Sequence, residues 1–260
     1  MKCHLGLLLM INEVAFIKSP LLFKNKFFIY PPSVKEIIET KEFPMYRRLF
    51  TLSQEELEDE FIKNNKDKII DNIVIPTPFE YLLKNIEVSP QFSAIAKKAF
   101  KYFLHEDVSF LLKEGMILIG NVEKEILKAK SVEELKFLKE EDYFEFQNLI
   151  RESLGEKSIE PPNPNEDPRV KRIKAKARYR DSIKMKKGLG ISLGTSLASI
   201  CCMGLGITPL NIGEMSYASL GSITRTYQEK EKYQIDIDSL LAGADSKKIK
   251  PKYWIRNLED

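Results

Sequence analysis

Apolar residues recur at helical spacing through much of the first 150 residues, and start signals for helices precede them. Ser33, Ser53 and Thr77 are each followed three residues later by glutamate. This is the pattern of a capping box, in which the two residues cap each other's backbone N–H groups. A fourth start is Ser89, because Pro90 then occupies the favoured first helical position. The pattern predicts a helix after each of these four starts.

Shorter apolar runs bounded by turn residues predict extended structure. Residues 5–30 read as extended, with an aromatic and β-branched run at 27–30 that follows a polar turn. The apolar runs 108–112 and 116–119 flank a turn that contains Gly115, which indicates a β-hairpin. We expect this hairpin to pair with the early strands in one small antiparallel sheet.

Further helices are predicted at 122–129, at 131–138 and around 142–150. The composition changes at Gly155, and residues 160–168 hold four prolines in nine residues with almost no apolar content. Such a stretch cannot continue a helix and offers little to bury, so it indicates a linker. The chain is thus divided into an α+β domain at 1–155, a Pro/Asn-rich linker at 156–168 and a helical domain at 169–260.

Beyond the linker the chain changes from strongly basic to uncharged. Residues 169–187 form a predicted helix with ten Lys or Arg and one acid, whereas the 26 residues of 188–213 carry no charge. Helices are then predicted at 211–232 and at 235–241, the second ending before Gly243. The whole pattern predicts an α+β fold that is predominantly α.

The composition is typical of a soluble, folded chain. The 260 residues are 43% hydrophobic and 30% charged, and a formal net charge of +3 gives no global field that attracts nucleic acid. Cys3, Cys201 and Cys202 make no disulfide framework, which favours a reducing compartment. The apolar run 5–11 is short for a signal peptide and lacks a small-residue cleavage site, so a buried strand is favoured. We expect a cytoplasmic protein.

No residue pattern in the chain points to catalysis. His4 and His105 lie far apart, and the histidines and cysteines allow no zinc-site spacing. The glycines around 188–194 match no phosphate-binding fingerprint. The acidic runs lie on amphipathic helices, whose exposed faces are usually charged. We therefore expect no enzymatic activity, no cofactor and no metal.

The basic and uncharged segments each have a second interpretation. The charge density of 169–187 would release counterions on a nucleic acid, but only Tyr179 could stack on a base and no nucleic-acid motif surrounds it. A solvated or acid-pairing helix face is favoured. The segment 188–213 is long enough to span a bilayer, but its serines, glycines and Thr208-Pro209 pair argue against insertion. Neither nucleic acid nor membrane is the expected partner.

Several segments together are similar to proteins encoded in the tail modules of bacteriophages of Gram-positive bacteria. Residues 18–37 (KSPLLFKNKFFIYPPSVKEI) resemble the opening of these proteins, and 141–150 (EDYFEFQNLI) with the linker resemble their middle. Residues 208–217 (TPLNIGEMSY), 236–245 (DIDSLLAGAD) and 253–256 (YWIR) resemble their C-terminal part. The family is that of the phage tail assembly chaperones, also found in phage-like contractile particles.

The resemblance implies a non-enzymatic protein of the bacterial host cytoplasm. Such a protein binds the hydrophobic tape-measure protein, recruits tail-tube subunits during assembly and leaves the finished particle. These families often add a C-terminal extension by ribosomal frameshifting, and the linker lies where two such parts would join.

A chaperone for an apolar helical client needs apolar surface that its own fold does not bury. The segment 188–206 is the predicted client surface, because its small residues allow close helix packing, and the basic helix beside it could steer an acidic partner. Self-association, a membrane-associated protein and another phage structural or adaptor role remain as alternatives. The residues predicted to contact the partner are Leu189, Ile191, Leu193, Leu197, Ile200, Met203, Leu205 and Ile207.

Overall fold

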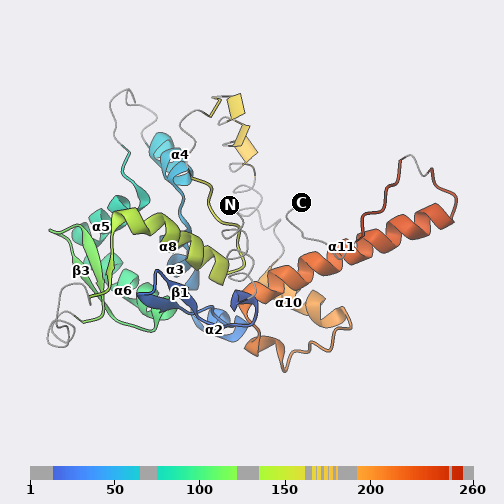
Figure 1. Cartoon of the computed structure of the whole chain (residues 1–260), viewed down its shortest axis with the longest axis horizontal. Coiled ribbons are helices and arrows are strands. Elements are labelled where there is room, and N and C mark those ends of the chain that lie inside the picture. Colours follow the sequence, from blue (N-terminus) through green and yellow to red (C-terminus); the bar gives the residue numbers. More distant parts are fainter. Residues whose placement is uncertain are drawn as a thin grey trace.

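The computed structural model describes residues 14–64, 75–121, 135–161, 192–245 and 248–253, together with 166, 167, 169, 170, 173, 174, 176, 177 and 180. It shows a helical body with two small antiparallel sheets, from which one long helix projects (Figure 1). The predicted α+β, predominantly α class is confirmed. The elements are β1 (Leu21–Phe23), β2 (Phe27–Ile29), α2 (Val34–Glu39), α3 (Phe43–Thr51), α4 (Gln54–Asn64), α5 (Pro78–Val88), α6 (Pro90–Leu104), β3 (Val108–Leu111), β4 (Met116–Ile119), β5 (Phe137–Leu138), α8 (Glu140–Ser153), α10 (Leu193–Cys202), η3 (Ile212–Glu214) and α11 (Tyr217–Leu241).

The four predicted helix starts are confirmed, because each capping residue makes its expected hydrogen bond. The Ser33 hydroxyl accepts from the Glu36 amide at 3.2 Å, and the Glu36 carboxylate accepts from the Ser33 amide at 2.6 Å. Ser53 and Thr77 make the same reciprocal pairs. Ser89 caps α6, whose first residue is Pro90. Each cap satisfies backbone donors that the helix itself cannot pair.

The expectation of one sheet that joins the hairpin to the early strands is wrong. β1 pairs with β2 alone, and the predicted β3–β4 hairpin gains its third strand from β5. The helix predicted through 131–138 is therefore also wrong at 137–138, since Phe137 and Leu138 pair with β4. Residues 14–16 are helical where extended chain was expected. The strand predicted at 5–11 and the helix predicted at 122–129 lie outside the described residues.

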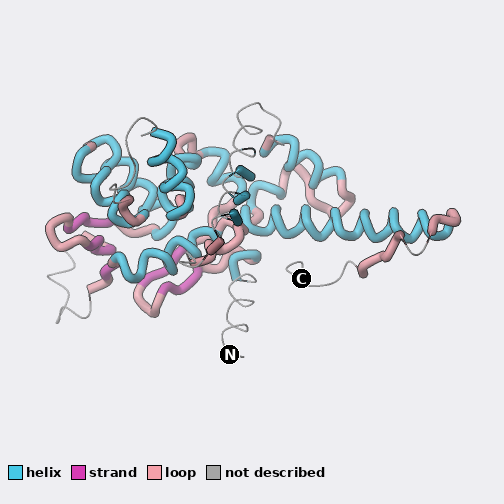
Figure 2. Tube along the Cα trace, turned by 90° about the horizontal axis from the view of Figure 1, so that it is seen from above, coloured by secondary structure: helices cyan, strands magenta, loops and turns pink. Residues whose placement is uncertain are grey.

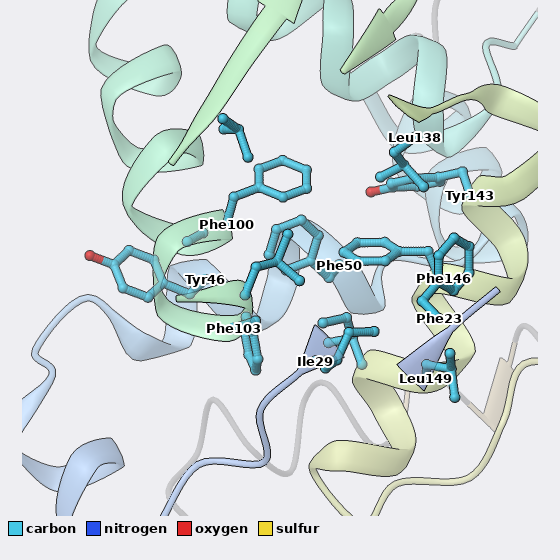
Figure 3. Packing of buried hydrophobic residues seen from close by; sticks show 14 of the residues in the cluster. Phe23, Ile29, Tyr46, Phe50, Phe100, Phe103, Leu138, Tyr143, Phe146 and Leu149 are labelled. Carbon is cyan, nitrogen blue, oxygen red and sulfur yellow. The ribbon is translucent and has the colours of Figure 1, made fainter. Parts of the chain in front are cut away.

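The main core is a cluster of aromatic rings around Phe146 on α8 (Figure 3). The Phe146 ring lies 5.5 Å from that of Phe50, 5.9 Å from that of Phe100 and 6.0 Å from that of Phe23. These three rings belong to α3, α6 and β1, so α8 is the element onto which the N-terminal helices and the first hairpin pack. Two of these pairs are edge-to-face and the pair with Phe100 is stacked, and such ring contacts add to the stabilisation that burial alone provides.

An ion pair fixes the turn between β1 and β2 on α8. The Lys24 ammonium lies 2.5 Å from the Asp142 carboxylate, and Lys26 lies 3.6 Å from its second oxygen. Burial raises the pKa of Asp142, but the hydrogen bond from Lys24 and the charges of both lysines outweigh it. They hold the pKa of Asp142 below its ordinary value, so the carboxylate stays ionised in its buried position.

The C-terminal elements pack against the N-terminal part. The Val34 amide donates to the Met215 carbonyl at 3.0 Å, and the Tyr217 amide donates to the Pro32 carbonyl at 2.9 Å. The Ser216 hydroxyl donates to the Ala15 carbonyl at 2.7 Å. A second small core joins α2 to α10, η3 and the first turn of α11, and its buried members are Val34, Ile200, Ile212 and Leu220. The division into two domains stays a prediction. The hydrogen bonds and the second core attach the start of α11 to the N-terminal part.

The C-terminal helix differs from its prediction in extent. Helices were expected at 211–232 and 235–241, whereas η3 comes first and α11 then runs unbroken from Tyr217 to Leu241. The tight turn of η3 allows Ile212 to enter the second core before the long helix begins.

Candidate protein-binding surfaces

The uncharged segment forms a short helix and a loop that fold back on the body. Ser192 caps α10 by accepting from the Thr195 amide at 3.1 Å. The hydroxyls of Ser196 and Ser199 donate to carbonyls one turn earlier, at 3.1 and 2.9 Å. The polar side chains of this segment are thus satisfied locally, which suits a helix with a small apolar surface. Within the described ranges, no helix is long and apolar enough to cross a membrane.

Most of the predicted contact residues that the structure describes are turned inward. Ile200 is 1% exposed at the centre of the second core, and Leu193 packs against the main core. Leu197, Met203 and Ile207 pack around Ile200, whereas Leu205 is 49% exposed. Leu189 and Ile191 lie outside the described residues. Partner binding by this set stays a prediction, and in this conformation the segment chiefly attaches α11 to the body.

Exposed apolar side chains of the C-terminal part lie along α11, among them Ile235 at 61% and Leu241 at 81%. Only its first turn is buried, through Ala218, Ser219 and Leu220. From there the helix extends beyond α10 and away from the body in both perpendicular views (Figures 1 and 2). We call residues 225–241 the α11 arm. Its 17 residues span about 25 Å at 1.5 Å per residue.

Apolar side chains recur at a regular spacing along α11, from just before the arm to its end. One face of the helix carries the apolar residues Ile223, Tyr227, Ile237 and Leu241. Lys230 and Gln234 lie between them on the same face, and the six positions are alternately four and three residues apart. We call these four side chains the α11 stripe. Leu241 is 81% exposed and the other three are half-buried. Glu231 and Asp238 lie beside the stripe on the same side.

The chain's own tail covers part of the arm. The Tyr253 ring meets the Tyr233 ring edge-on at 5.7 Å, which brings the segment 248–253 back along the helix. Tyr253 itself remains 58% exposed. The contact therefore shields one side of the arm without enclosing it.

A pocket lies where three helices begin. The N-terminal ends of α4, α5 and α8 meet the extended residues 158–160 around a cavity of about 610 Å³. Its walls are mainly apolar, and its mouth carries three glutamates and one lysine. The lining residues are Ser53, Gln54, Glu55, Thr77, Pro78, Phe79, Glu140, Tyr143, Phe144, Gln147, Ser158, Ile159, Glu160 and Lys174.

The described positions of the basic segment are helical and exposed. Val170 is 43% and Ile173 is 67% exposed, so neither of these two apolar side chains is buried on the body. Lys174 pairs with Glu166 at 2.6 Å. The hydrogen bond to Glu166, followed by the charges of Glu166, Glu55 and Glu160, raises the pKa of Lys174. At this position the basic segment faces acids of its own chain.

The structure describes one of the two histidines, His105, and two of the three cysteines, Cys201 and Cys202. His105 caps the end of α6 in a left-handed conformation and stacks on Tyr30 with ring centroids 4.0 Å apart. Cys201 and Cys202 are both free thiols. In the part of the chain that the structure describes, no three His, Cys, Asp or Glu residues are grouped so that they could hold a metal ion.

No protein-family model, curated protein or solved structure matches the chain. The resemblance to tail assembly chaperones accordingly remains an expectation from the sequence.

The sequence interpretation missed the arm. It predicted helices at 211–232 and at 235–241 but assigned no partner surface to them, because an apolar stripe on a helix usually meets a core. The signal that could have found the arm is the charged run 229–232 inside the stripe, since a buried helix would not place Lys230 on its apolar face.

Proposed function

We propose that this protein is a non-enzymatic assembly chaperone of phage-type tails that binds the tape-measure protein and delivers it to tail-tube subunits. The observation that carries the proposal is the α11 arm, an apolar stripe on a helix that leaves the body after one buried turn. The family resemblance of the sequence supplies the identity of the client. The arm supplies a surface of the kind that such a client requires.

An unsupported helix of this length is only marginally stable in water, because helix stability in proteins comes chiefly from packing of an apolar face. A partner helix that covers the stripe would provide that packing. Complete burial of a side chain such as Leu241 contributes about 1.5–3 kcal/mol, and the stripe has four large apolar members. A contact of this strength can hold a client and can also release it. Release is required of a chaperone that leaves the finished particle.

The charged residues beside the stripe act when no client covers the arm. Glu231 and Asp238 keep the uncovered arm hydrated and oppose pairing with an acidic partner helix. Gln234 and Lys230 interrupt the apolar face midway along the arm, which limits the contiguous apolar area exposed to water. The arm is thus suited to a client whose helix is apolar and not acidic.

Co-expression with the tape-measure protein encoded beside it tests this function. We expect a complex that remains in the supernatant on sedimentation and is recovered by pull-down. The double variant Ile237→Asp and Leu241→Asp should reduce the recovered complex at least about tenfold, since two charges would replace two buried contacts. Gln228→Asp, which adds one charge outside the stripe, is the control and should leave recovery unchanged.

The two parts of the proposal fail separately. If the double variant binds as well as the unmodified chain, the arm is not the client surface although the function stands. If the tape-measure protein pellets and none is recovered with the unmodified chain, the proposed function is wrong.

A further inference from the structure

The pocket at the beginnings of α4, α5 and α8 has features that the proposed chaperone function does not use. Phe79 and Tyr143 are each 2% exposed and form fixed walls, whereas Phe144 is 37% exposed at the side of the opening. The Tyr143 hydroxyl donates to the Leu49 carbonyl at 3.2 Å, and the Gln147 amide donates to the Leu52 carbonyl at 2.9 Å. These bonds hold the α8 side of the pocket in place. Its volume of about 610 Å³ is sufficient for a large side chain with its backbone.

One wall of the pocket is formed by residues 158–160, which belong to no helix or strand. The Ile159 amide donates to the Asn148 side-chain oxygen at 2.6 Å, and the Asn148 side-chain nitrogen donates to the Ile159 carbonyl at 3.3 Å. These two hydrogen bonds hold the backbone of Ile159 against α8, in the way that a neighbouring strand pairs with a strand. Successive peptide groups of extended chain point to opposite sides, so the backbone groups of Ser158 and Glu160 lie on the side away from Asn148. Those groups make no hydrogen bond to any other residue that the structure describes.

The mouth of the pocket carries an excess of negative charge. Glu55, Glu140 and Glu160 line it against one cation, Lys174. The Thr77 hydroxyl donates to the Glu140 carboxylate at 2.8 Å, which fixes that group at the edge. Lys174 also lines the pocket, but its ammonium pairs at 2.6 Å with Glu166, which is not a lining residue. A ligand with positive charge beside an apolar group complements this arrangement.

We propose that this pocket binds an extended peptide segment of a partner protein, with a large apolar side chain in the cavity and a basic residue two positions to either side. The extended form follows from the segment 158–160, whose unpaired backbone groups can add a strand. The spacing of two follows because alternate side chains of extended chain share one face. The basic residues would lie against Glu55, Glu140 and Glu160, and the site is separate from the α11 arm.

A labelled peptide with the sequence Lys-Thr-Phe-Thr-Lys tests the proposal by fluorescence anisotropy with the full-length protein. We expect saturable binding that weakens at least about tenfold when phenylalanine becomes alanine or when both lysines become glutamate. On the protein, Glu55→Lys with Glu160→Lys should weaken binding by a similar factor, whereas Glu87→Lys, an exposed glutamate elsewhere on α5, should not. Phe144→Ala should weaken binding about threefold, and Phe28→Ala, which removes a 46% exposed ring on β2, is its control.

Equal binding of the lysine and glutamate peptides would overturn the proposal, as would absence of saturable binding up to millimolar peptide. Equal loss from the pocket variants and from their controls would also contradict it, because a general effect on the fold would then explain the change. Selective loss from the pocket variants, with thermal unfolding unchanged, supports it.

Discussion

Replacing Phe146 by alanine is expected to lower the free energy of unfolding by about 4 kcal/mol, since large cavities in aromatic cores cost 3–5 kcal/mol. The Phe146 side chain is fully buried and meets rings from α3, α6 and the first hairpin. Its loss would leave a cavity at the place where the separate parts of the N-terminal region meet. Urea unfolding followed by circular dichroism measures the change.

The control for this prediction lies two residues away on the same helix. Phe144 is 37% exposed, so Phe144→Ala should cost about 1 kcal/mol or less. Equal destabilisation by the two substitutions would show that α8 is not held by the aromatic cluster as described here.

Replacing Gly155 by alanine is expected to cost about 3 kcal/mol, from a left-handed backbone and a steric clash together. Gly155 ends α8 with a positive φ of +67°, and the Glu156 amide donates back to Arg151 in a Schellman arrangement. A Cβ at this position would lie 2.8 Å from the backbone of Ala218 on α11. The substitution should therefore push α11 away from α8, and thermal unfolding monitored by calorimetry measures its cost.

Gly115→Ala separates the cost of the left-handed backbone from the cost of the steric clash. Gly115 has a φ of +63° but nothing within 4 Å of an added Cβ. This variant should lose only the backbone contribution, about 1 kcal/mol. If Gly155→Ala costs no more than Gly115→Ala, the close contact between α8 and α11 does not exist in solution.

The parts of the fold that the sequence predicted are those that depend on neighbours along the chain. Ser33, Thr77 and their glutamates lie within one turn, so a capping box determines its own geometry. The hairpin around Gly115 is local in the same way. The strand at 137–138 was missed because its pairing with β4 depends on residues about twenty positions away, and two residues carry too little pattern to show it.

The candidate surfaces were harder to predict, because exposure is a property of the assembled chain. Ile200 and Leu205 belong to the same uncharged run and have the same apolar character, yet one is buried and the other is half exposed. Which of them faces inward depends on where α2 and η3 lie. The pocket combines residues from five separate segments, and no spacing along the chain connects Glu55 with Ile159.

Hydrogen exchange along α11, read by mass spectrometry, tests whether the arm is an uncovered surface that the client occupies. We expect amides of 227–241 in the free protein to exchange at least about a hundredfold faster than those of α6, because neither core of the described residues includes the arm. In the complex with the tape-measure protein, the same amides should become protected while those of α6 change little. An arm already as protected as α6 in the free protein, or one unaffected by the tape-measure protein, would contradict the account.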